Sequence, residues 1–305
     1  AIKNSFEKLK DSKMYVTLEP CNHYGKTPPC TKNIIKSGIS ELIYSMEDID
    51  KRVKGKSFKI LLNKKIKVKR GLLIKDAKDL YDSYIKNRTS KLPYVTAKIA
   101  VSKNKLIYSK GTKRITDKNS DKITHYLRYK NDSIMISSKT LNIDDPRLTC
   151  RLKGYNKFSP KRIILDKNLD IKLTSYIFQS AKKGNTILFY HSSNTKKIKI
   201  LKKKGLTLIK TKLNNEGLLD LKMVLKKLFT LGTRSLLVEG GDKISKNLIK
   251  NRLIDTFYLF QSPKILRVNK INQGFTSFGI LNGKYKKVSK ITSKLAKDNI
   301  TIYKR

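Results

Sequence analysis

The sequence predicts an α/β fold in two domains, and three observations lead to this prediction. Segments with helix-like and strand-like patterns alternate along the chain, as in layered α/β proteins. At 305 residues the chain is longer than a usual single domain. A polar stretch ending in a proline, residues 88–93, breaks the helical pattern and is typical of a linker. We therefore place the domains at residues 1–90 and 91–305.

The first domain is predicted to alternate helices with strands. Residues 1–10 have the pattern of the later part of a helix, and two prolines with a following glycine predict a helix at residues 28–37. Apolar runs and helical periodicity predict the other elements. Strands are expected at residues 14–18, 41–46 and 66–73, and further helices at residues 58–62 and 76–88.

The second domain is predicted to begin with a strand rich in β-branched residues, at 94–102. The alternation of strands with helices then continues, without any internal repeat. Further strands are expected at residues 133–137, 162–165, 186–190, 206–210, 235–238 and 256–260, and helices at residues 117–129, 220–231 and 244–253.

The composition limits the classes of partner. The formal net charge is +47, which by itself predicts attraction to nucleic acid or anionic membranes. However, 58 of the 70 basic residues are Lys, and these lysines are dispersed through every segment. A surface that binds phosphates specifically favours Arg. We therefore expect weak, salt-sensitive nonspecific binding and no specific nucleic-acid site. No apolar run is long enough to cross a bilayer. Three cysteines make a disulfide framework improbable and suit a reducing compartment.

Two cysteines carry the sharpest local signal. Cys21 follows a predicted strand, and eight residues separate it from Cys30, which lies at a predicted helix start. A helix N-terminus lowers the pKa of a thiol, so Cys30 is expected to be a thiolate ligand. Zinc takes such ligands tetrahedrally, and two cysteines supply half of a site. Two buried structural thiols, or a closed zinc site, are the alternatives.

The residues around the pair narrow this choice. Residues 17–30 (TLEPCNHYGKTPPC) closely resemble the deaminase signature of the bifunctional riboflavin-biosynthesis deaminase/reductase family. The resemblance implies that Cys21 and Cys30 bind Zn²⁺ and that His23 and Lys26 contact the substrate. Zinc deaminases of bases also need an upstream His-x-Glu motif, and no His precedes residue 23. We therefore expect an N-terminally truncated chain that begins after this motif, with zinc under-ligated.

In the second domain, polar and glycine residues cluster where strands are predicted to end. These clusters are Lys98, residues 140–151 and residues 238–241. Ligands of open α/β sheets collect at the carboxyl ends of strands, and a Gly-Gly pair before a helix offers backbone N–H groups to a phosphate. A plain turn, a turn carboxylate and a strand-end lysine are the alternative interpretations.

Taken together and in order, these clusters resemble the reductase half of the same family, which has a dihydrofolate-reductase-like fold. The fold class implied is a partial cytidine-deaminase-like α/β/α layer followed by that α/β domain. The resemblance implies catalytic roles for Lys98, Asp144 and Glu239. It also implies two sets of binding residues. The NADPH site would contain Ala100, Arg114, Thr140, Asp144, Gly240 and Gly241, and the phosphoribosylamino substrate would contact Thr112, Arg128, Leu148, Arg151 and Glu239.

The chain departs from the family pattern at a few positions. Residues 103–105 are Lys-Asn-Lys where the family usually has Leu-Asp-Gly, and Arg114 replaces a usual Trp. Arg114 could hold a cofactor phosphate or indicate a weakened site. Thr256 replaces a usual Glu after Asp255.

The resemblance implies a cytoplasmic enzyme of riboflavin biosynthesis, acting on a small pyrimidine ribosyl phosphate and forming a homodimer. It would deaminate a diaminopyrimidine ribosyl phosphate and reduce the ribose of the product with NADPH. Two alternatives stay open at this stage. One is a reductase-only protein with a degenerate deaminase half, and the other is a zinc-containing nucleic-acid-binding protein.

Overall fold

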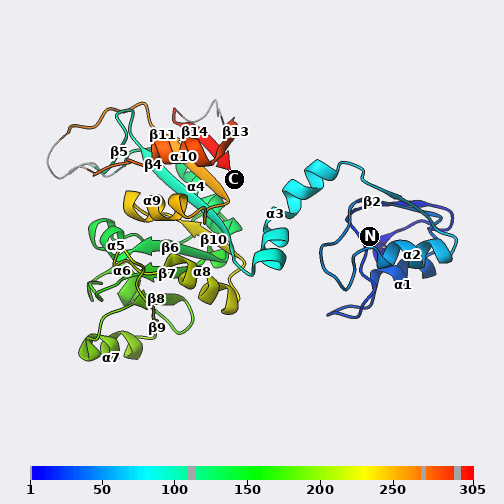
Figure 1. Ribbon diagram of the computed structural model, residues 1–305, viewed down its shortest axis with the longest axis horizontal. Helices are drawn as coiled ribbons and strands as arrows, with labels where there is room; N and C mark the ends of the chain where they lie inside the picture. The colour runs from blue at the N-terminus through cyan, green and yellow to red at the C-terminus, as the bar shows by residue number, and fades with distance from the viewer. Residues whose placement is uncertain (1, 109–113, 269–272, 292–296) are drawn as a thin grey trace. The chain divides into compact units, whose positions relative to one another are not determined.

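The computed structural model describes residues 2–108, 114–268, 273–291 and 297–305. The chain forms two compact units, Ala1–Lys91 and Leu92–Arg305, drawn in Figure 1 from blue to cyan and from cyan to red. Each unit has its own sheet and its own apolar core. None of the described helices is long and apolar enough to cross a membrane.

Unit 1 is a parallel three-stranded sheet with helices. Its strands are ordered β1-β2-β3, and residues such as Ile34, Leu42 and Leu61 form its core. The elements are β1 (Lys13–Leu18), α1 (Cys30–Lys36), β2 (Glu41–Met46), α2 (Lys56–Asn63), β3 (Lys67–Arg70) and α3 (Ile74–Ser90).

Two predictions for this unit were wrong. Residues 1–10 were expected to be helical, but in the described part of this segment, residues 2–10, only a 3₁₀ turn, Ile2–Asn4, forms. A short helix depends on tertiary packing, and the Phe6 side chain, the largest apolar group of this segment, is fully exposed. The expected linker is also shorter than predicted, because α3 continues to Ser90 and ends where Lys91 adopts a positive φ of 55°.

Unit 2 is built on a nine-stranded sheet of order β13-β14-β11-β4-β10-β6-β7-β8-β9. The strands from β11 to β9 are parallel, and β14 and β13 continue the sheet antiparallel. The strands are β4 (Tyr94–Val101), β6 (Ser133–Ser137), β7 (Lys161–Leu165), β8 (Thr186–Tyr190), β9 (Thr207–Lys210), β10 (Ser235–Val238), β11 (Thr256–Gln261), β13 (Lys286–Ile291) and β14 (Asn299–Lys304). A separate two-stranded sheet joins β5 (Leu106–Tyr108) to β12 (Gln273–Gly274).

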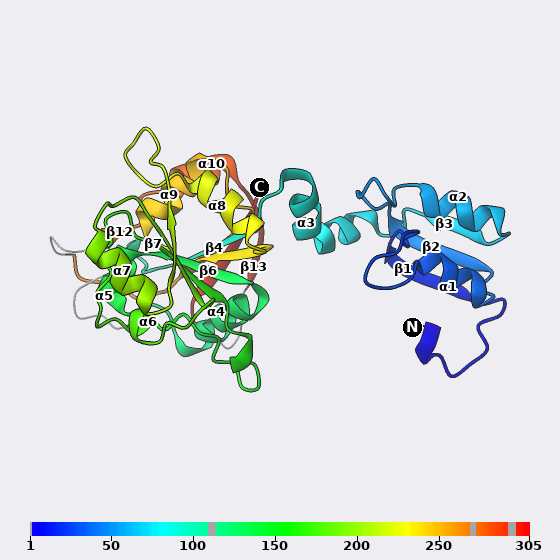
Figure 2. The ribbon, with the colours of Figure 1, turned by 90° about the horizontal axis from the view of Figure 1, so that it is seen from below.

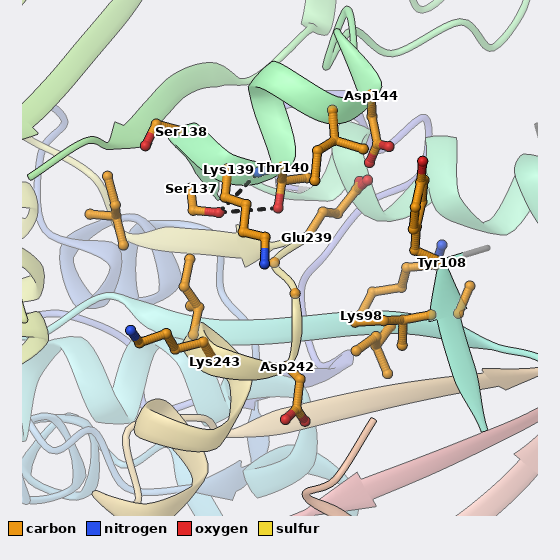
Figure 3. A pocket seen from close by; sticks show the side chains of 18 of the residues that line it. Lys98, Tyr108, Ser137, Ser138, Lys139, Thr140, Asp144, Glu239, Asp242 and Lys243 are labelled. Carbon is orange, nitrogen blue, oxygen red and sulfur yellow. Dashed lines mark hydrogen bonds between the residues drawn. The ribbon is translucent and has the colours of Figure 1, made fainter. Parts of the chain in front are cut away.

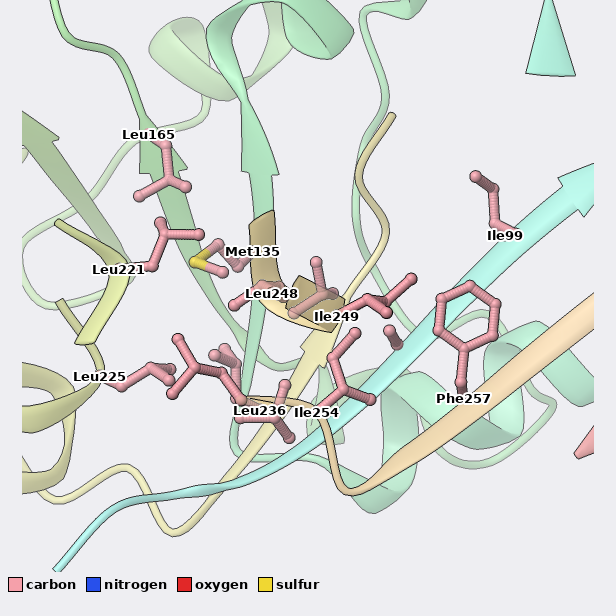
Figure 4. Packing of buried hydrophobic residues seen from close by; sticks show 14 of the residues in the cluster. Ile99, Met135, Leu165, Leu221, Leu225, Leu236, Leu248, Ile249, Ile254 and Phe257 are labelled. Atoms are coloured by element: carbon pink, nitrogen blue, oxygen red, sulfur yellow. The ribbon is translucent and has the colours of Figure 1, made fainter. Parts of the chain in front are cut away.

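Helices cover both faces of the large sheet, as Figure 2 shows. One apolar core lies under α8 (Leu221–Thr230), α9 (Asp242–Lys250) and α10 (Phe278–Lys284). Part of this core is drawn in Figure 4, where Leu225, Leu236 and Leu248 lie together. The second core lies on the other face. Its helices are α4 (Lys118–Lys130), α5 (Ser138–Asp144), α6 (Tyr176–Gln179) and α7 (Thr195–Lys203).

The period-2 alternation of a strand decides which side chains reach the site. In β4, Val95, Ala97, Ile99 and Val101 belong to the core under α8, α9 and α10. Lys98 alternates with them and therefore points to the opposite face, the face covered by α4. Since β4 pairs with β10 on one side and β11 on the other, Lys98 lies on a central strand.

Candidate functional site

Unit 2 contains a cavity of about 1370 Å³ over the sheet. Single ligands usually occupy 300–1,000 Å³, so this cavity has room for two of them. Figure 3 shows Thr140 and Asp144 along one side of the cavity, Lys98 and Asp242 along the other, and Glu239 between them. Eight basic and five acidic side chains line the cavity, and this positive balance suits phosphorylated ligands.

A buried ion pair forms the inner wall. Arg128 on α4 reaches Glu239, which follows β10, through two parallel hydrogen bonds of 2.8 Å from Nε and Nη2. The Arg128 Nη1 group donates a third bond of 3.1 Å to the carbonyl oxygen of Thr149. The Lys98 ammonium lies 4.8 Å from the centre of the Phe260 ring. The cluster thus joins α4, β4 and the end of β10.

Burial and these charges shift the pKa values of the cluster. Burial lowers the pKa of Lys98, and the attraction of Glu239 offsets only part of this shift. Burial acts to raise the pKa of Glu239, but Arg128 and Lys98 outweigh it, and the pKa lies below its usual value. Burial also lowers the pKa of His125, and the positive charges of Arg128 and Arg151 act in the same direction. His125 is therefore neutral at pH 7, beside an ionised Glu239.

The α4 helix brings its polar residues to the cavity by its cap and its spacing. The Asp117 carboxylate caps the helix, accepting two backbone N–H bonds of 2.8 Å from Asn119 and Ser120. His125 and Arg128 are three residues apart and so lie on one helical face. His125 Nδ1 accepts a 3.3 Å bond from the backbone N–H of Arg151, which ties the next loop to this face.

Every residue predicted for the cofactor site reaches the cavity. Ala100, Arg114, Thr140, Asp144, Gly240 and Gly241 all line it. Gly241 precedes α9, whose first turn offers backbone N–H groups to an anion. A Cβ atom on Gly240 would lie 3.2 Å from the Ile244 side chain, so a larger residue would crowd this turn. Lys243 and Lys246 add positive charge. These groups fit a dinucleotide with phosphates.

Asp144 and Thr140 are positioned by α5. The helix begins with a cap in which the Ser137 hydroxyl accepts a 3.2 Å bond from the Thr140 N–H group. The hydroxyls of Ser137 and Thr140 are also 3.1 Å apart (Figure 3). Burial raises the pKa of Asp144, so this carboxylate takes up a proton more readily than an exposed one.

The residues predicted for the substrate have three different outcomes. Arg128, Arg151 and Glu239 line the cavity. Leu148 does not, because its side chain is buried in the core between α4 and the sheet. Thr112 lies outside the described residues. Lys98 was expected at a strand end, yet it lies within β4, opposite Tyr258 of β11.

The residues that depart from the family pattern at positions 104, 105 and 114 fit the local backbone or have side-chain partners nearby. Lys105 takes the left-handed conformation with φ of 65°, where the family usually has Gly. The Asn104 carboxamide accepts 2.7 Å and 3.1 Å bonds from Ser102 and the Leu266 N–H, and donates a 2.8 Å bond to the Leu266 carbonyl. Arg114 forms a 2.8 Å ion pair with Asp121 of α4 at the cavity wall.

Sequence reasoning missed part of the lining. Tyr108 comes from β5, which was not predicted because the strand is only three residues long. Ser137, Lys139 and Asp242 were also missed. Their signal was present in the sequence, because Ser137 ends a buried strand, Lys139 lies two residues beyond it and Asp242 follows the Gly-Gly turn, all places where ligands collect.

The cysteine pair lies in unit 1. The sulfur atoms of Cys21 and Cys30 are 3.3 Å apart, and the backbone N–H of Cys30 donates a 3.4 Å bond to the Cys21 sulfur. The expectation of a lowered pKa at Cys30 was wrong. Burial raises the pKa of its thiol, and the hydrogen bond with Cys21 adds to the rise.

The residues present fit a zinc site only in part. Two adjacent thiols are suitable ligands, but among the described residues no cluster of three or more His, Cys, Asp or Glu could hold a metal. His23 Nδ1 is buried without a hydrogen-bond partner. Lys26 is exposed. Glu19, which was not predicted, is buried and accepts backbone N–H bonds of 3.0 Å and 3.3 Å from Gly55 and Ser57, fixing the strand that leads to Cys21.

Comparison with known proteins follows this division of the chain. The family described as "RibD C-terminal domain" matches residues 93–295, and "Cytidine and deoxycytidylate deaminase zinc-binding region" matches residues 1–46. The "Riboflavin biosynthesis protein RibD" of Aquifex aeolicus is 35% identical over 268 residues, covering 87% of this chain and 73% of the relative. The RibD protein of Buchnera aphidicola subsp. Baizongia pistaciae is 31% identical, with coverage of 87% and 74%.

Solved structures agree with the sequence relatives. A deaminase/reductase from Thermotoga maritima has a TM-score of 0.80 and 28% identity, covering 98% of this chain and 80% of its own. The RibD of Acinetobacter baumannii has a TM-score of 0.82 at 23% identity, with coverage of 100% and 83%. The predicted α/β class, a deaminase-like part before a reductase domain, is confirmed. With its two matched regions in this order, the chain belongs to the RibD family of riboflavin-biosynthesis proteins.

Proposed function

We propose that unit 2 is the NADPH-dependent reductase of a bifunctional riboflavin-biosynthesis enzyme. Its substrate would be 5-amino-6-(5-phosphoribosylamino)uracil, the compound in the printed name of the Thermotoga maritima relative. The observation that carries the proposal is the Arg128–Glu239 pair beside Lys98, at the centre of a cavity large enough for a cofactor and a substrate together.

NADPH would supply the hydride that converts the ring-opened ribose to a ribityl chain. The Gly240–Gly241 turn would hold its phosphates at the start of α9, with Lys243 and Lys246 nearby. Thr140 and Asp144 on α5 would contact the cofactor from the opposite wall. Arg114 supports this assignment less strongly, because its guanidinium is already paired with Asp121.

The buried cluster would orient the sugar. Glu239, kept ionised by Arg128, would accept hydrogen bonds from ribose hydroxyls. Lys98 would donate an N–H bond to a sugar oxygen close to the reacting carbon, and its lowered pKa makes it a better proton donor than an exposed lysine. Arg128 and Arg151 would bind the sugar phosphate through the planar fork that suits this group.

Unit 1 would be the deaminase part. Cys21 and Cys30 would provide two zinc ligands, and His23 and Lys26 would contact the pyrimidine ribosyl phosphate. The match of residues 1–46 to a deaminase zinc-binding region supports this assignment. We propose residues 1–90 and 91–305 as the limits of the two functional domains. We also propose a cytoplasmic homodimer, and light scattering of the purified chain would test the dimer.

The reductase is tested by measuring NADPH oxidation with 5-amino-6-(5-phosphoribosylamino)uracil. The wild-type chain should turn over, and Asp144→Asn and Glu239→Gln should each reduce kcat/KM by about a hundredfold, the loss expected for a misplaced reacting group. Glu216→Gln, an exposed loop residue with the same change of charge as Glu239→Gln, is the matched control. A folded wild-type chain without turnover would overturn the proposal.

A further inference from the structure

A second cavity opens beside the reductase site. It has a volume of about 390 Å³ and is lined by Arg128, Pro146, Arg147 and Arg151. Arg128 and Arg151 also line the large cavity, so the two cavities share a wall. Three of the four lining residues are arginines, and no acidic residue is among them. This lining matches a compact dianion and is poorly suited to an apolar or cationic group.

The donors of these arginines are partly unused. Arg128 has five N–H donors, of which two bond Glu239 and one bonds the Thr149 carbonyl. Arg151 has one long bond of 3.5 Å to the Thr149 hydroxyl. Among the described residues, neither Arg147 nor Arg151 has a carboxylate within ion-pair distance. Unpaired donors therefore remain on all three residues.

The arginines also repel each other. Burial lowers the pKa of Arg151, and the charges of Arg128 and Arg147 lower it further. An anion bound in the cavity would offset the repulsion between these positive charges.

The loop that carries Arg147 is fixed before any ligand arrives. The Asp145 carboxylate accepts a 2.8 Å bond from the backbone N–H of Tyr176, and the Arg147 guanidinium lies 5.4 Å from the centre of the Tyr176 ring. Leu148 is buried with a positive φ of 57°. The Cys150 N–H donates a 3.1 Å bond to the Ser159 hydroxyl. A loop held at both ends loses little entropy when it binds.

We propose that Arg147 is a specificity-determining residue of the reductase, the third guanidinium of a clamp that recognises the phosphate monoester of the sugar substrate. This inference rests on the proposed function, which gives roles to Arg128 and Arg151 but none to Arg147. The substrate phosphate would lie between the three side chains, and Tyr176 would hold the Arg147 fork in the plane that faces it.

The test compares two substrates with the whole 305-residue chain. One is 5-amino-6-(5-phosphoribosylamino)uracil and the other is the same compound without its phosphate. In Arg147→Gln we expect the KM for the phosphorylated compound to rise about tenfold. We expect kcat, the KM for NADPH and the kcat/KM for the dephosphorylated compound to stay within about twofold. Arg147→Lys should recover part of the loss, because Lys keeps the charge but not the fork.

Lys196→Gln on α7 removes one exposed positive charge elsewhere in unit 2 and should change none of these constants. An unchanged KM for the phosphorylated compound in Arg147→Gln would overturn the proposal. An equal loss for both substrates would also overturn it, because it would indicate a structural role. A rise in the KM for NADPH alone would assign the clamp to the cofactor phosphate instead.

A binding measurement separates this proposal from the proposed function. Calorimetry with ribose 5-phosphate should show about tenfold weaker binding to Arg147→Gln than to the wild type, and ribose without phosphate should bind neither protein measurably. If the wild-type chain fails to oxidise NADPH but shows this difference, the reductase assignment fails and the clamp stands. Equal binding of ribose 5-phosphate to both proteins would refute the clamp whatever the turnover.

Discussion

The two candidate sites differ in how they are completed. In unit 1 the two sulfur atoms of Cys21 and Cys30 are 3.3 Å apart, and the described residues add no further ligand. In unit 2 Arg128, Glu239 and Lys98 come from three elements and line one large cavity. Arg128 and Glu239 form hydrogen bonds with each other, and the charge of Glu239 influences the pKa of Lys98. A metal site depends on its number of ligands, whereas the reductase site depends on buried charges whose partners are already present.

The largest effect is expected from Glu239→Gln. The substitution leaves the Arg128 guanidinium and the Lys98 ammonium buried without a counter-charge. We expect the free energy of unfolding to fall by on the order of 3 kcal/mol and kcat/KM to fall by about a hundredfold or more. Urea unfolding and NADPH oxidation measure the two effects. A loss no larger than that of the Glu216→Gln control would show that the ion pair is not essential.

A smaller effect should appear in the dependence of stability on pH. The pKa of Glu239 is lowered in the folded state, so its contribution is present above the unfolded value of about 4.3 and is lost as the pH falls through the folded value. The stability difference between wild type and Glu239→Gln should therefore shrink from pH 6 to pH 3. Urea midpoints at four pH values would measure this. A constant difference would contradict the assigned ionisation.

A still smaller effect is expected at the loop beside the cavity. Asn104→Ala removes the three hydrogen bonds that join this turn to Ser102 and Leu266. Because the side chain is exposed, we expect a loss of about 1 kcal/mol in the free energy of unfolding. Asn104→Asp, which keeps the acceptor and loses the donor, should lose less. Thermal unfolding compares the two variants. If both lose the same stability, the side-chain acceptor that Asn104→Asp keeps contributes nothing.

The smallest effect tests whether the two sites are independent. Cys21→Ser combined with Cys30→Ser should abolish zinc bound by unit 1, measured by elemental analysis. NADPH oxidation should stay within about twofold of wild type, because every residue that lines the large cavity belongs to unit 2. A reductase loss of tenfold or more would show that the sites are coupled.

The sequence predicted the strand pattern of unit 2 well, because its central strands are buried on both faces and contain uninterrupted apolar runs such as residues 134–136. It did not predict the helices α5, α6, α7 and α10 or the strands β5, β12, β13 and β14. β5 and α6 are too short for a periodic signal, and the lysine-rich β13 has no apolar pattern. The helix expected at residues 1–10 has a plausible local pattern, and Ile2 and Leu9 pack against the core of unit 1, but Phe6 between them is fully exposed.

The candidate site was predicted by residue type better than by geometry. Lys98, Arg128 and Glu239 were named from motifs, yet only the strand order brings them together. The burial of Leu148 and the third arginine of the clamp depend on the path of the 144–151 loop, which is fixed by contacts with Tyr176, Ser159 and His125. Such long-range contacts leave no periodic trace in the sequence.

The strand order of unit 2 also has a consequence for synthesis on the ribosome. β4 is the first strand of its unit, but its neighbours are β10 and β11, so that Tyr94 pairs with Ser235 and Thr96 with Thr256. Unit 1, whose sheet uses only nearby segments, can fold while the rest is being translated. Strand β4 of unit 2 therefore stays unpaired until most of the chain has left the ribosome. We expect a chaperone to bind this exposed apolar strand during that time.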